Sequence, residues 1–264
     1  MTAVLALWRP PPVWLPGTVQ MWKRDALLYK RSWKRNVLPN FFEPLLYLLS
    51  IGLGLGVYVG QKILGVDYAD YIAPGLAAAA AMNGAVFETT FNVFVKLRFA
   101  KLYDAVITTP LEPEDVAAGE LLWAVTRSVI YGTAFLIVMA VLGYVHYWAV
   151  IFAPAAAALV GLSFGLIGLV FTSLTPTIDL FSYFFTLFIT PLFLFSGIFF
   201  PVSRLGSAAF VAWFSPLYHG AELMRGLILT GDLGWAAAHA LWLVVFSALV
   251  FPPAINLMRR RLVT

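Results

Sequence analysis

The chain has 264 residues, of which 61% are hydrophobic and only 11% charged, against about 45–50% and about 25% in soluble globular domains. This composition excludes a soluble domain, a disordered chain and a charged coiled coil, and it predicts a protein whose main solvent is lipid. The absence of cysteine excludes disulfides, zinc–thiolate sites and cysteine nucleophiles, while the net charge of +4 is informative only through where the charges fall.

Residues 1–17 form a proline-rich leader, and residues 18–36 are predicted to form an amphipathic helix with Thr18 as its N-cap. Aromatic and apolar side chains recur at spacings of three and four on one face, and lysines and arginines cover the rest. A basic, tryptophan-bearing helix of this kind lies in the membrane interface. Its candidate contact residues are Trp22, Lys23, Arg24, Tyr29 and Trp33. The helix is either an anchor that sets the topology or a docking surface for a cytosolic partner.

Six apolar stretches reach the length of about 20 residues that a bilayer-crossing helix needs. They are residues 38–59, 71–95, 121–144, 148–174, 180–200 and 235–258. Between the fourth and fifth, a proline and an aspartate in residues 175–179 predict a tight turn. The sequence therefore predicts an all-α polytopic membrane protein, with a single six-helix domain over residues 37–264.

Lysine and arginine set the predicted orientation. Fourteen of the seventeen lie before the first span, in or beside the connection between the second and third, or after the last span. The other three, Lys62, Arg204 and Arg225, lie in the alternate loops. By the positive-inside rule both termini are predicted to be cytoplasmic. A positive charge distributed in this way indicates membrane topology, and we expect no nucleic-acid partner.

The largest predicted cytoplasmic connection, residues 96–120, is longer than a simple turn requires. It contains a short amphipathic helix, predicted over residues 98–108, which forms a second candidate docking surface. Its candidate contact residues are Arg98, Lys101, Leu102, Tyr103, Asp104 and Val106. Pro113, followed by Glu114 and Asp115, suits the first turn of the third helix, where proline loses no hydrogen bond and carboxylates meet the positive end of the helix dipole.

Residues 201–234 are too apolar for a solvated outer loop and predict short helices that dip in from the outer face, at residues 208–214 and 220–229. Glu222 and Arg225 are three residues apart and are predicted to pair, either at a gate or as an exposed interfacial ion pair. Within the spans, Glu88 is expected to form a structural pair with Arg127 or to take part in transport.

Several catalytic interpretations are excluded by where their residues lie in the sequence. The G-x-S-x-G pattern around Ser163 lies inside an apolar span, where glycines four apart permit close helix packing, and not on a strand-to-helix turn. No Gly-Lys dipeptide exists to form a Walker A loop, and the three histidines have no metal-ligand spacing. The alternatives are an intramembrane hydrolase and an ATPase-independent carrier or channel. The carrier would require a mid-membrane charge or an inverted repeat, and neither is visible.

Six strings along the chain resemble the type-2 ABC exporter permeases, most of all their nodulation-factor exporter branch. They are FEPLLYLL at 42–49, APGL at 73–76, YDA and TPL at 103–111, TPLFLFSGIFFP at 190–201 and PLYHGAELMR at 216–225. The resemblance covers nearly the whole chain from Met21 onward. It implies a bacterial inner-membrane subunit that forms a homodimer and works with two separate ATPase subunits. It also implies that these ATPase subunits hold ATP and Mg, so that this chain needs no cofactor of its own.

By the same resemblance, residues 18–34 are the connector helix, residues 98–108 the coupling helix, and the first and fifth spans the dimer seam. Candidate residues of the seam or path are a phenylalanine stripe in the fifth span and glycines of the first: Phe181, Phe185, Phe188, Phe195, Phe199, Gly52 and Gly56. The alternative for the stripe is contact with lipid. The implied cargo is amphiphilic or glycan-bearing, although drug and lipid exporters share this frame.

Overall fold

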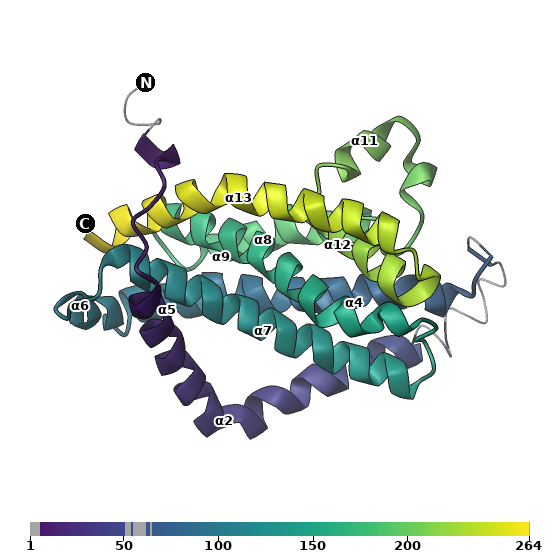
Figure 1. Ribbon diagram of the computed structural model, residues 1–264, viewed down its shortest axis with the longest axis horizontal. Helices are drawn as coiled ribbons and strands as arrows, with labels where there is room; N and C mark the ends of the chain where they lie inside the picture. The colour runs from purple at the N-terminus through teal and green to yellow at the C-terminus, as the bar shows by residue number, and fades with distance from the viewer. Residues whose placement is uncertain (1–5, 51–53, 55–61, 64, 264) are drawn as a thin grey trace.

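The computed structural model describes residues 6–50, 54, 62–63 and 65–263, and for residues 6, 34–41, 43–44 and 207–208 it describes the backbone alone. Apart from one isolated bridge between Ile63 and Val66, the regular structure of these residues is helical. Most helices run along the long axis of the molecule (Figure 1). The short helix α6 (Leu102–Ile107) and the end of the last helix, α13 (Leu233–Val263), lie at one end of this bundle, which we call the α6 end (Figure 1).

The predicted interfacial helix and the start of the first span form one helix, α2 (Leu15–Leu49), which bends so that its first half crosses the bundle and its second half runs along it (Figure 1). The helix begins before Thr18, so the predicted cap is wrong. Trp14 occupies the cap position and its backbone N–H donates to Asp115, while Pro16 fits the first turn because it needs no N–H partner there. No helix end separates residues 18–36 from the span. Gly52 and Gly56 lie outside the described residues.

The predicted second span comprises α4 (Tyr68–Phe87), a π-helical turn η3 (Glu88–Asn92) and α5 (Val93–Arg98) in succession. At η3 the hydroxyls of Thr89 and Thr90 donate to carbonyl oxygens of the preceding turn. Such single π turns inside α-helices are frequent at functional sites. The third helix, α7 (Pro113–Val141), begins at Pro113 as predicted, with a capping box between Glu112 and Asp115.

The predicted turn between the fourth and fifth spans is confirmed, because helix α8 ends at Leu174 and α9 begins at Leu180. The fourth segment consists of η4 (Trp148–Phe152) and α8 (Ala153–Leu174). The fifth segment consists of α9 (Leu180–Phe184), a second π turn η5 (Phe185–Ile189) and α10 (Thr190–Phe195). It therefore ends five residues before the predicted boundary at 200.

The region predicted to hold two short dipping helices contains η6 (Val202–Ala208), α11 (Ala209–Ala212), α12 (Pro216–Arg225) and η7 (Gly226–Thr230). The second of the predicted helices starts four residues earlier than expected. Ser215 caps it by accepting a hydrogen bond from the Tyr218 N–H, and Pro216 fills its first position. We call the end of the bundle that holds the α12–α13 connection the α12 end.

Small residues bring the central helices α4, α7 and α8 close together. A Cβ atom at Gly161 would overlap the side chain of Ser128, and one at Gly165 would lie 2.9 Å from Leu121 Cδ1. The packing role predicted for these glycines is confirmed, while the Ser163 hydroxyl between them bonds to Ser247 at 2.9 Å. The G-x-S-x-G pattern is thus part of a helix interface.

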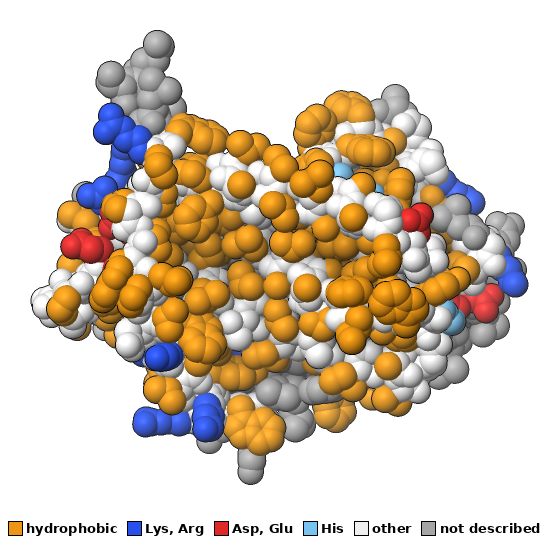
Figure 2. Space-filling model, in the orientation of Figure 1, with side chains coloured by type: hydrophobic (Ala, Val, Ile, Leu, Met, Phe, Trp, Pro, Cys, Tyr) orange, Lys and Arg blue, Asp and Glu red, His pale blue; other side chains and the backbone are white. Residues whose placement is uncertain are grey.

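Within the described part of the chain, three segments are long and apolar enough to cross a membrane, judged by length and composition. They are Pro113–Val141, Trp148–Leu174 and Leu233–Val263, and the apolar segment Leu180–Phe195 is shorter. Hydrophobic side chains cover the middle of the visible face, and charged side chains gather toward its two ends (Figure 2). This pattern is typical of a protein whose central part lies in lipid.

Candidate functional site

The predicted coupling helix is shorter than expected. Residues 98–108 are not one helix, because Arg98 ends α5 and Lys101 adopts a left-handed conformation with φ of 46° before α6 begins at Leu102. This turn folds α6 back across the α6 end of the bundle (Figure 1). One face of α6, which carries Tyr103, is buried against the bundle, and the face that carries Asp104 is exposed.

Tyr103 is the residue by which α6 is fastened to the bundle. Its side chain is fully buried and its hydroxyl donates a hydrogen bond of 2.8 Å to Glu120 Oε1 of α7. Burial, together with this carboxylate, raises the pKa of Tyr103 well above its ordinary value, so the hydroxyl stays protonated and remains a donor. Tyr103 was expected on the contact surface of this helix, and it points inward instead.

Lys96 lies at the centre of the site, where α2, η3, α5 and α7 meet. Its ammonium lies 2.7 Å from Glu120 Oε2, 3.1 Å from Asp25 Oδ2 and 3.4 Å from Glu88 Oε1. All three carboxylates are buried. One cation therefore joins the first half of α2, the π turn of the second segment and the start of the third helix, which also holds α6 through Tyr103. We call Asp25, Glu88, Lys96, Tyr103 and Glu120 the Lys96 cluster.

The charge of Lys96 is stabilised by its surroundings. The carboxylates of Glu120, Asp25 and Glu88 lie close enough to the ammonium to offset the cost of burying its charge.

Aromatic side chains also hold the first half of α2 against α7. The Trp22 indole N–H donates to Thr126 Oγ1 at 2.9 Å, and the Tyr29 ring meets Trp123 edge-on at 5.5 Å between centroids. Lys23 and Trp33 are exposed, whereas Arg24 is half-buried and pairs with Asp25. The predicted contact residues thus divide into those that hold the helix and those that face outward.

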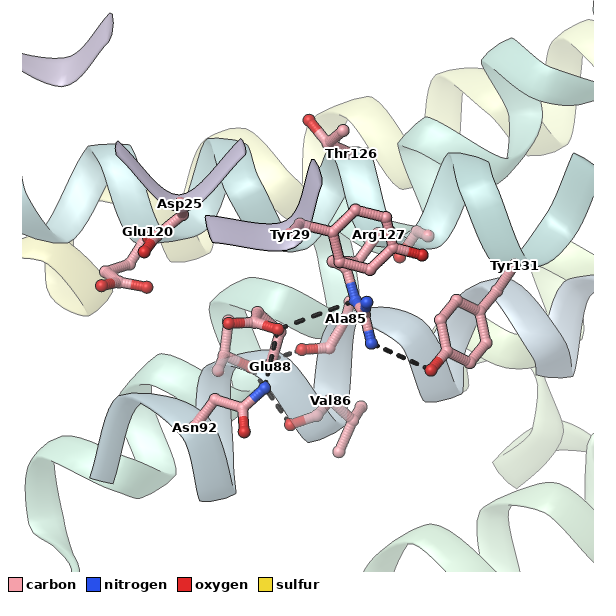
Figure 3. Close-up of polar contacts among 12 residues, drawn as sticks. Asp25, Tyr29, Ala85, Val86, Glu88, Asn92, Glu120, Thr126, Arg127 and Tyr131 are labelled. Carbon is pink, nitrogen blue, oxygen red and sulfur yellow. Dashed lines mark hydrogen bonds and ion pairs between the residues drawn. The ribbon is translucent and has the colours of Figure 1, made fainter. Parts of the chain in front are cut away.

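The expected pairing of Glu88 with Arg127 is present. Arg127 Nε lies 3.7 Å from Glu88 Oε2, and the guanidinium lies between the rings of Tyr29 and Tyr131 (Figure 3). Glu88 also accepts a hydrogen bond from Asn92 across the π turn (Figure 3). Because Glu88 contacts both Arg127 and Lys96, the pair extends the Lys96 cluster toward the middle of α7.

The phenylalanine stripe of the fifth segment has two environments. Phe181 is fully buried, and Phe185 is half-buried and stacks on Phe87 with centroids 4.9 Å apart, so these two rings pack inside the chain. Phe188 and Phe195 are 42% and 54% exposed, and Phe199 is half-buried like Phe185. Phe188 and Phe195 therefore present the most surface to lipid or to another chain.

The expected pair of Glu222 and Arg225 is present at the α12 end of the bundle. It is not the exposed interfacial pair considered as an alternative, because the Arg225 side chain is 5% exposed and Glu222 also accepts from the Trp235 indole at 3.2 Å. Among the described residues, a basic side chain thus joins several segments at each end of the bundle, Lys96 at the α6 end and Arg225 at the α12 end.

The sequence patterns do not indicate Asp25, Lys96 and Glu120 as site residues. In the sequence, Lys96 contributes only to the predicted membrane topology, and Glu120 lies at the end of the predicted loop 96–120. A signal was available, since Asp25 is the only acid among the basic residues of 18–36 and Glu120 falls at the start of an apolar span. Acids in such positions are costly unless they are paired.

The helices and the Lys96 cluster define a helical membrane protein whose amphipathic elements at the α6 end are joined electrostatically to its long apolar helices. The family model of the ABC-2 type transporters matches residues 17–229, and the chain belongs to this family of membrane transport permeases.

Named relatives agree with this assignment. The chain is 36% identical over 244 residues to "Nodulation protein J" of Rhizobium leguminosarum bv. viciae, covering 92% of this chain and 93% of that protein. It is 32% identical to "Nodulation protein J" of Sinorhizobium fredii over 263 residues, covering 98% of this chain and 100% of the relative. A more distant relative is "Inner membrane transport permease YadH" of Escherichia coli, 24% identical over 190 residues, with 70% of this chain and 72% of that protein covered.

Proposed function

We propose that this chain is the membrane subunit of an ATP-driven exporter, that two copies form the translocation path, and that two separate ATPase subunits bind ATP and Mg and power it. The observation that carries the proposal is the Lys96 cluster, which connects the interfacial half of α2 and the short helix α6 to the same two long segments. A push on either surface element is transmitted through this joint into the bundle, and ATP-driven transport requires such transmission.

In this proposal the α6 end faces the cytoplasm of a bacterial inner membrane, both termini lie on that side, and six segments cross the bilayer. The distribution of lysine and arginine along the chain supports this orientation. The first half of α2 crosses the bundle axis at the α6 end, which suits an interfacial helix (Figure 1). Its exposed Lys23, Lys30 and Trp33 are suited to lipid headgroups or to the ATPase.

The proposed cargo is an amphiphilic molecule that bears a glycan, such as a lipo-oligosaccharide or a lipid-linked polysaccharide. The support is the similarity to relatives named for nodulation and the resemblance of the sequence to nodulation-factor exporters. Exposed phenylalanines of the fifth segment, Phe188 and Phe195, offer aromatic faces on which acyl groups or sugar rings pack.

Co-purification with a co-expressed candidate ATPase, followed by measurement of ATP hydrolysis, tests the proposal. We expect the tagged chain to retain the ATPase and to change its hydrolysis rate. Asp104→Lys on the exposed face of α6 is expected to weaken both, whereas Arg204→Met at an exposed site on the α12 end serves as the control. Failure of the intact chain to retain any ATPase encoded beside it, or equal retention by the Asp104→Lys variant, would overturn the proposal.

A further inference from the structure

Arg225 joins three separate parts of the chain at the α12 end. Its guanidinium lies over the Tyr71 ring, with 4.0 Å between Cζ and the ring centroid, and its Nε donates to the Tyr71 carbonyl oxygen at 3.2 Å. Its Nη2 donates to the carbonyl oxygens of Gly197 and Ile198, and its Nη1 pairs with Glu222. Every nitrogen of the guanidinium therefore has a partner within the chain.

Gly197 lies where the fifth segment stops being helical. Helix α10 ends at Phe195, and Gly197 has φ of 76°, a conformation that favours glycine. A Cβ atom there would lie 2.7 Å from Val202 Cγ2. The Gly197 carbonyl also accepts a hydrogen bond of 3.0 Å from the Tyr71 hydroxyl. Side chains of other helices thus satisfy the end of the fifth segment, so it can be released without unfolding a helix.

An apolar cavity of about 600 Å³ lies directly beside this point. Phe188, Phe195 and Ser196 of the fifth segment line one side, and Phe214 and Ser215 line the other. Its described lining residues include no charged side chain. The volume falls within the range of cavities that hold small ligands, about 300–1,000 Å³. Ser196, which lines the cavity, immediately precedes Gly197 in the chain.

We propose that Arg225 is the positioning residue that keeps this cavity closed toward the α12 end. While its guanidinium holds the carbonyls of Gly197 and Ile198, the end of the fifth segment stays packed against α12 and α4. Passage of an apolar group from the cavity requires these hydrogen bonds to break. The inference relies on the proposed function for the outward direction of passage and for the orientation that places the α12 end outside, while the contacts themselves are independent of any ATPase.

Arg225 acts in this proposal through Gly197 and not by touching cargo. The residue is 4% exposed, and its donors are directed at backbone carbonyls and at Glu222. Replacement by methionine keeps roughly the length of the side chain but leaves the carbonyl oxygens of Tyr71, Gly197 and Ile198 without their charged donor, an arrangement that favours exposure to water. Lysine supplies one compact charge and cannot reproduce the planar set of donors.

The experiment uses the absence of cysteine from the natural chain. Ser196→Cys introduces a single thiol of similar size at a site that is 1% exposed and lines the cavity. Intact cells that carry this variant are treated with a membrane-impermeant maleimide, and the labelling rate is measured. We expect slow labelling with Arg225 present and labelling at least about tenfold faster in the Arg225→Met background, which corresponds to the loss of hydrogen bonds to a charged donor.

Three further backgrounds test the result. Tyr71→Phe removes one of the donors to the Gly197 carbonyl and is expected to give a smaller increase, with Arg225→Lys between the two. Arg204→Met removes an exposed arginine from the same region and is expected to leave the rate unchanged. If Arg225→Met fails to accumulate as folded protein, the Tyr71→Phe and Arg225→Lys backgrounds decide the question.

Labelling within twofold of the parent rate in the folded Arg225 variants would overturn the inference, as would an equal increase with Arg204→Met. Because the measurement needs no ATPase, its outcome is separable from that of the proposed function. If the chain binds no ATPase but shows the labelling difference, the role of Arg225 is supported and the exporter assignment is wrong. If the chain binds an ATPase but shows no labelling difference, the exporter assignment is supported and the role of Arg225 is wrong.

Discussion

The Lys96 ammonium and the Glu120 carboxylate lie 2.7 Å apart in the interior of the α6 end, and they join the end of the second segment to the start of the third. Loss of this cation leaves the carboxylates of Asp25, Glu88 and Glu120 buried without it. Breaking a buried ion pair by removing one partner costs about 3–5 kcal/mol. We expect Lys96→Met to lower the thermal unfolding temperature of the purified chain and to reduce its effect on the ATPase.

The matched control for this prediction is Lys23→Met, which removes an exposed lysine from α2. It is expected to change the unfolding temperature little, since exposed ion pairs contribute about 0–1 kcal/mol. Lys96→Arg keeps the charge and should recover part of both readouts. Full stability and full ATPase coupling in the Lys96→Met protein would show that the cluster is not a joint between these helices.

The two faces of α6 make separable predictions. Tyr103→Phe removes the hydrogen bond to Glu120, a bond to a charged acceptor with a contribution of about 1.5–3 kcal/mol, and should destabilise the chain. Asp104→Asn changes an exposed residue and should leave the unfolding temperature unchanged while weakening ATPase retention. Thermal unfolding and co-purification are measured on both variants. Loss of stability with Asp104→Asn, or none with Tyr103→Phe, would reverse the assignment of the faces.

The sequence predicted most of this arrangement at the level of helices, because apolar length, proline positions and charge asymmetry are local signals. The start of α7 at Pro113 and the break after Leu174 are examples. Tertiary contacts decided the other boundaries. Trp14 caps α2 because Asp115, about 100 positions away in the chain, holds its N–H, and periodicity within residues 18–36 contains no trace of that contact.

Only two ion pairs of the structure were predictable from the sequence. Glu88 with Arg127 and Glu222 with Arg225 were inferred because an unpaired charge in lipid is costly. The convergence of three carboxylates on Lys96 depends on how α2 crosses the third helix, which the sequence does not determine. For the same reason the stripe from Phe181 to Phe199 reads as one face in sequence, although the structure buries Phe181 and exposes Phe195.

The side chain of Asn256 on the last helix binds the proline-rich leader through two hydrogen bonds. The Asn256 amide donates to the carbonyl oxygens of Leu7 and Arg9, at 2.9 and 2.8 Å. We expect Asn256→Ala to release the leader and to increase proteolytic cleavage within it severalfold in detergent, with little change in the unfolding temperature of the bundle. Ser247→Ala, on the same helix but bonded to Ser163, serves as the control. Equal protease resistance in the Asn256→Ala protein would mean that other contacts hold the leader.

Close helix packing at Gly161 predicts sensitivity to a single methyl group. A Cβ atom there would overlap Ser128, whose hydroxyl donates to the Ala81 carbonyl at 2.6 Å, so alanine forces α7 and α8 apart. Overpacking of this kind costs about 1–3 kcal/mol. Gly54→Ala is the control, because no described atom lies within 4 Å of the added Cβ atom. Thermal unfolding should separate the two variants, and equal stability would contradict the close approach of α7 and α8.

The exposed part of the fifth segment predicts where two copies meet. In a chain without natural cysteine, Phe188→Cys places one thiol on a ring position that is 42% exposed, whereas Phe181→Cys places it in the interior. If the fifth segment forms the seam, a short bis-maleimide should link two Phe188→Cys copies in membranes and should not link Phe181→Cys copies.

Leu249→Cys, at a site 56% exposed on α13, reports random collision between copies in the bilayer. Equal linking at residues 188 and 249 would assign the exposed phenylalanines to lipid, because a seam holds its thiols together persistently while collisions do not distinguish between exposed faces.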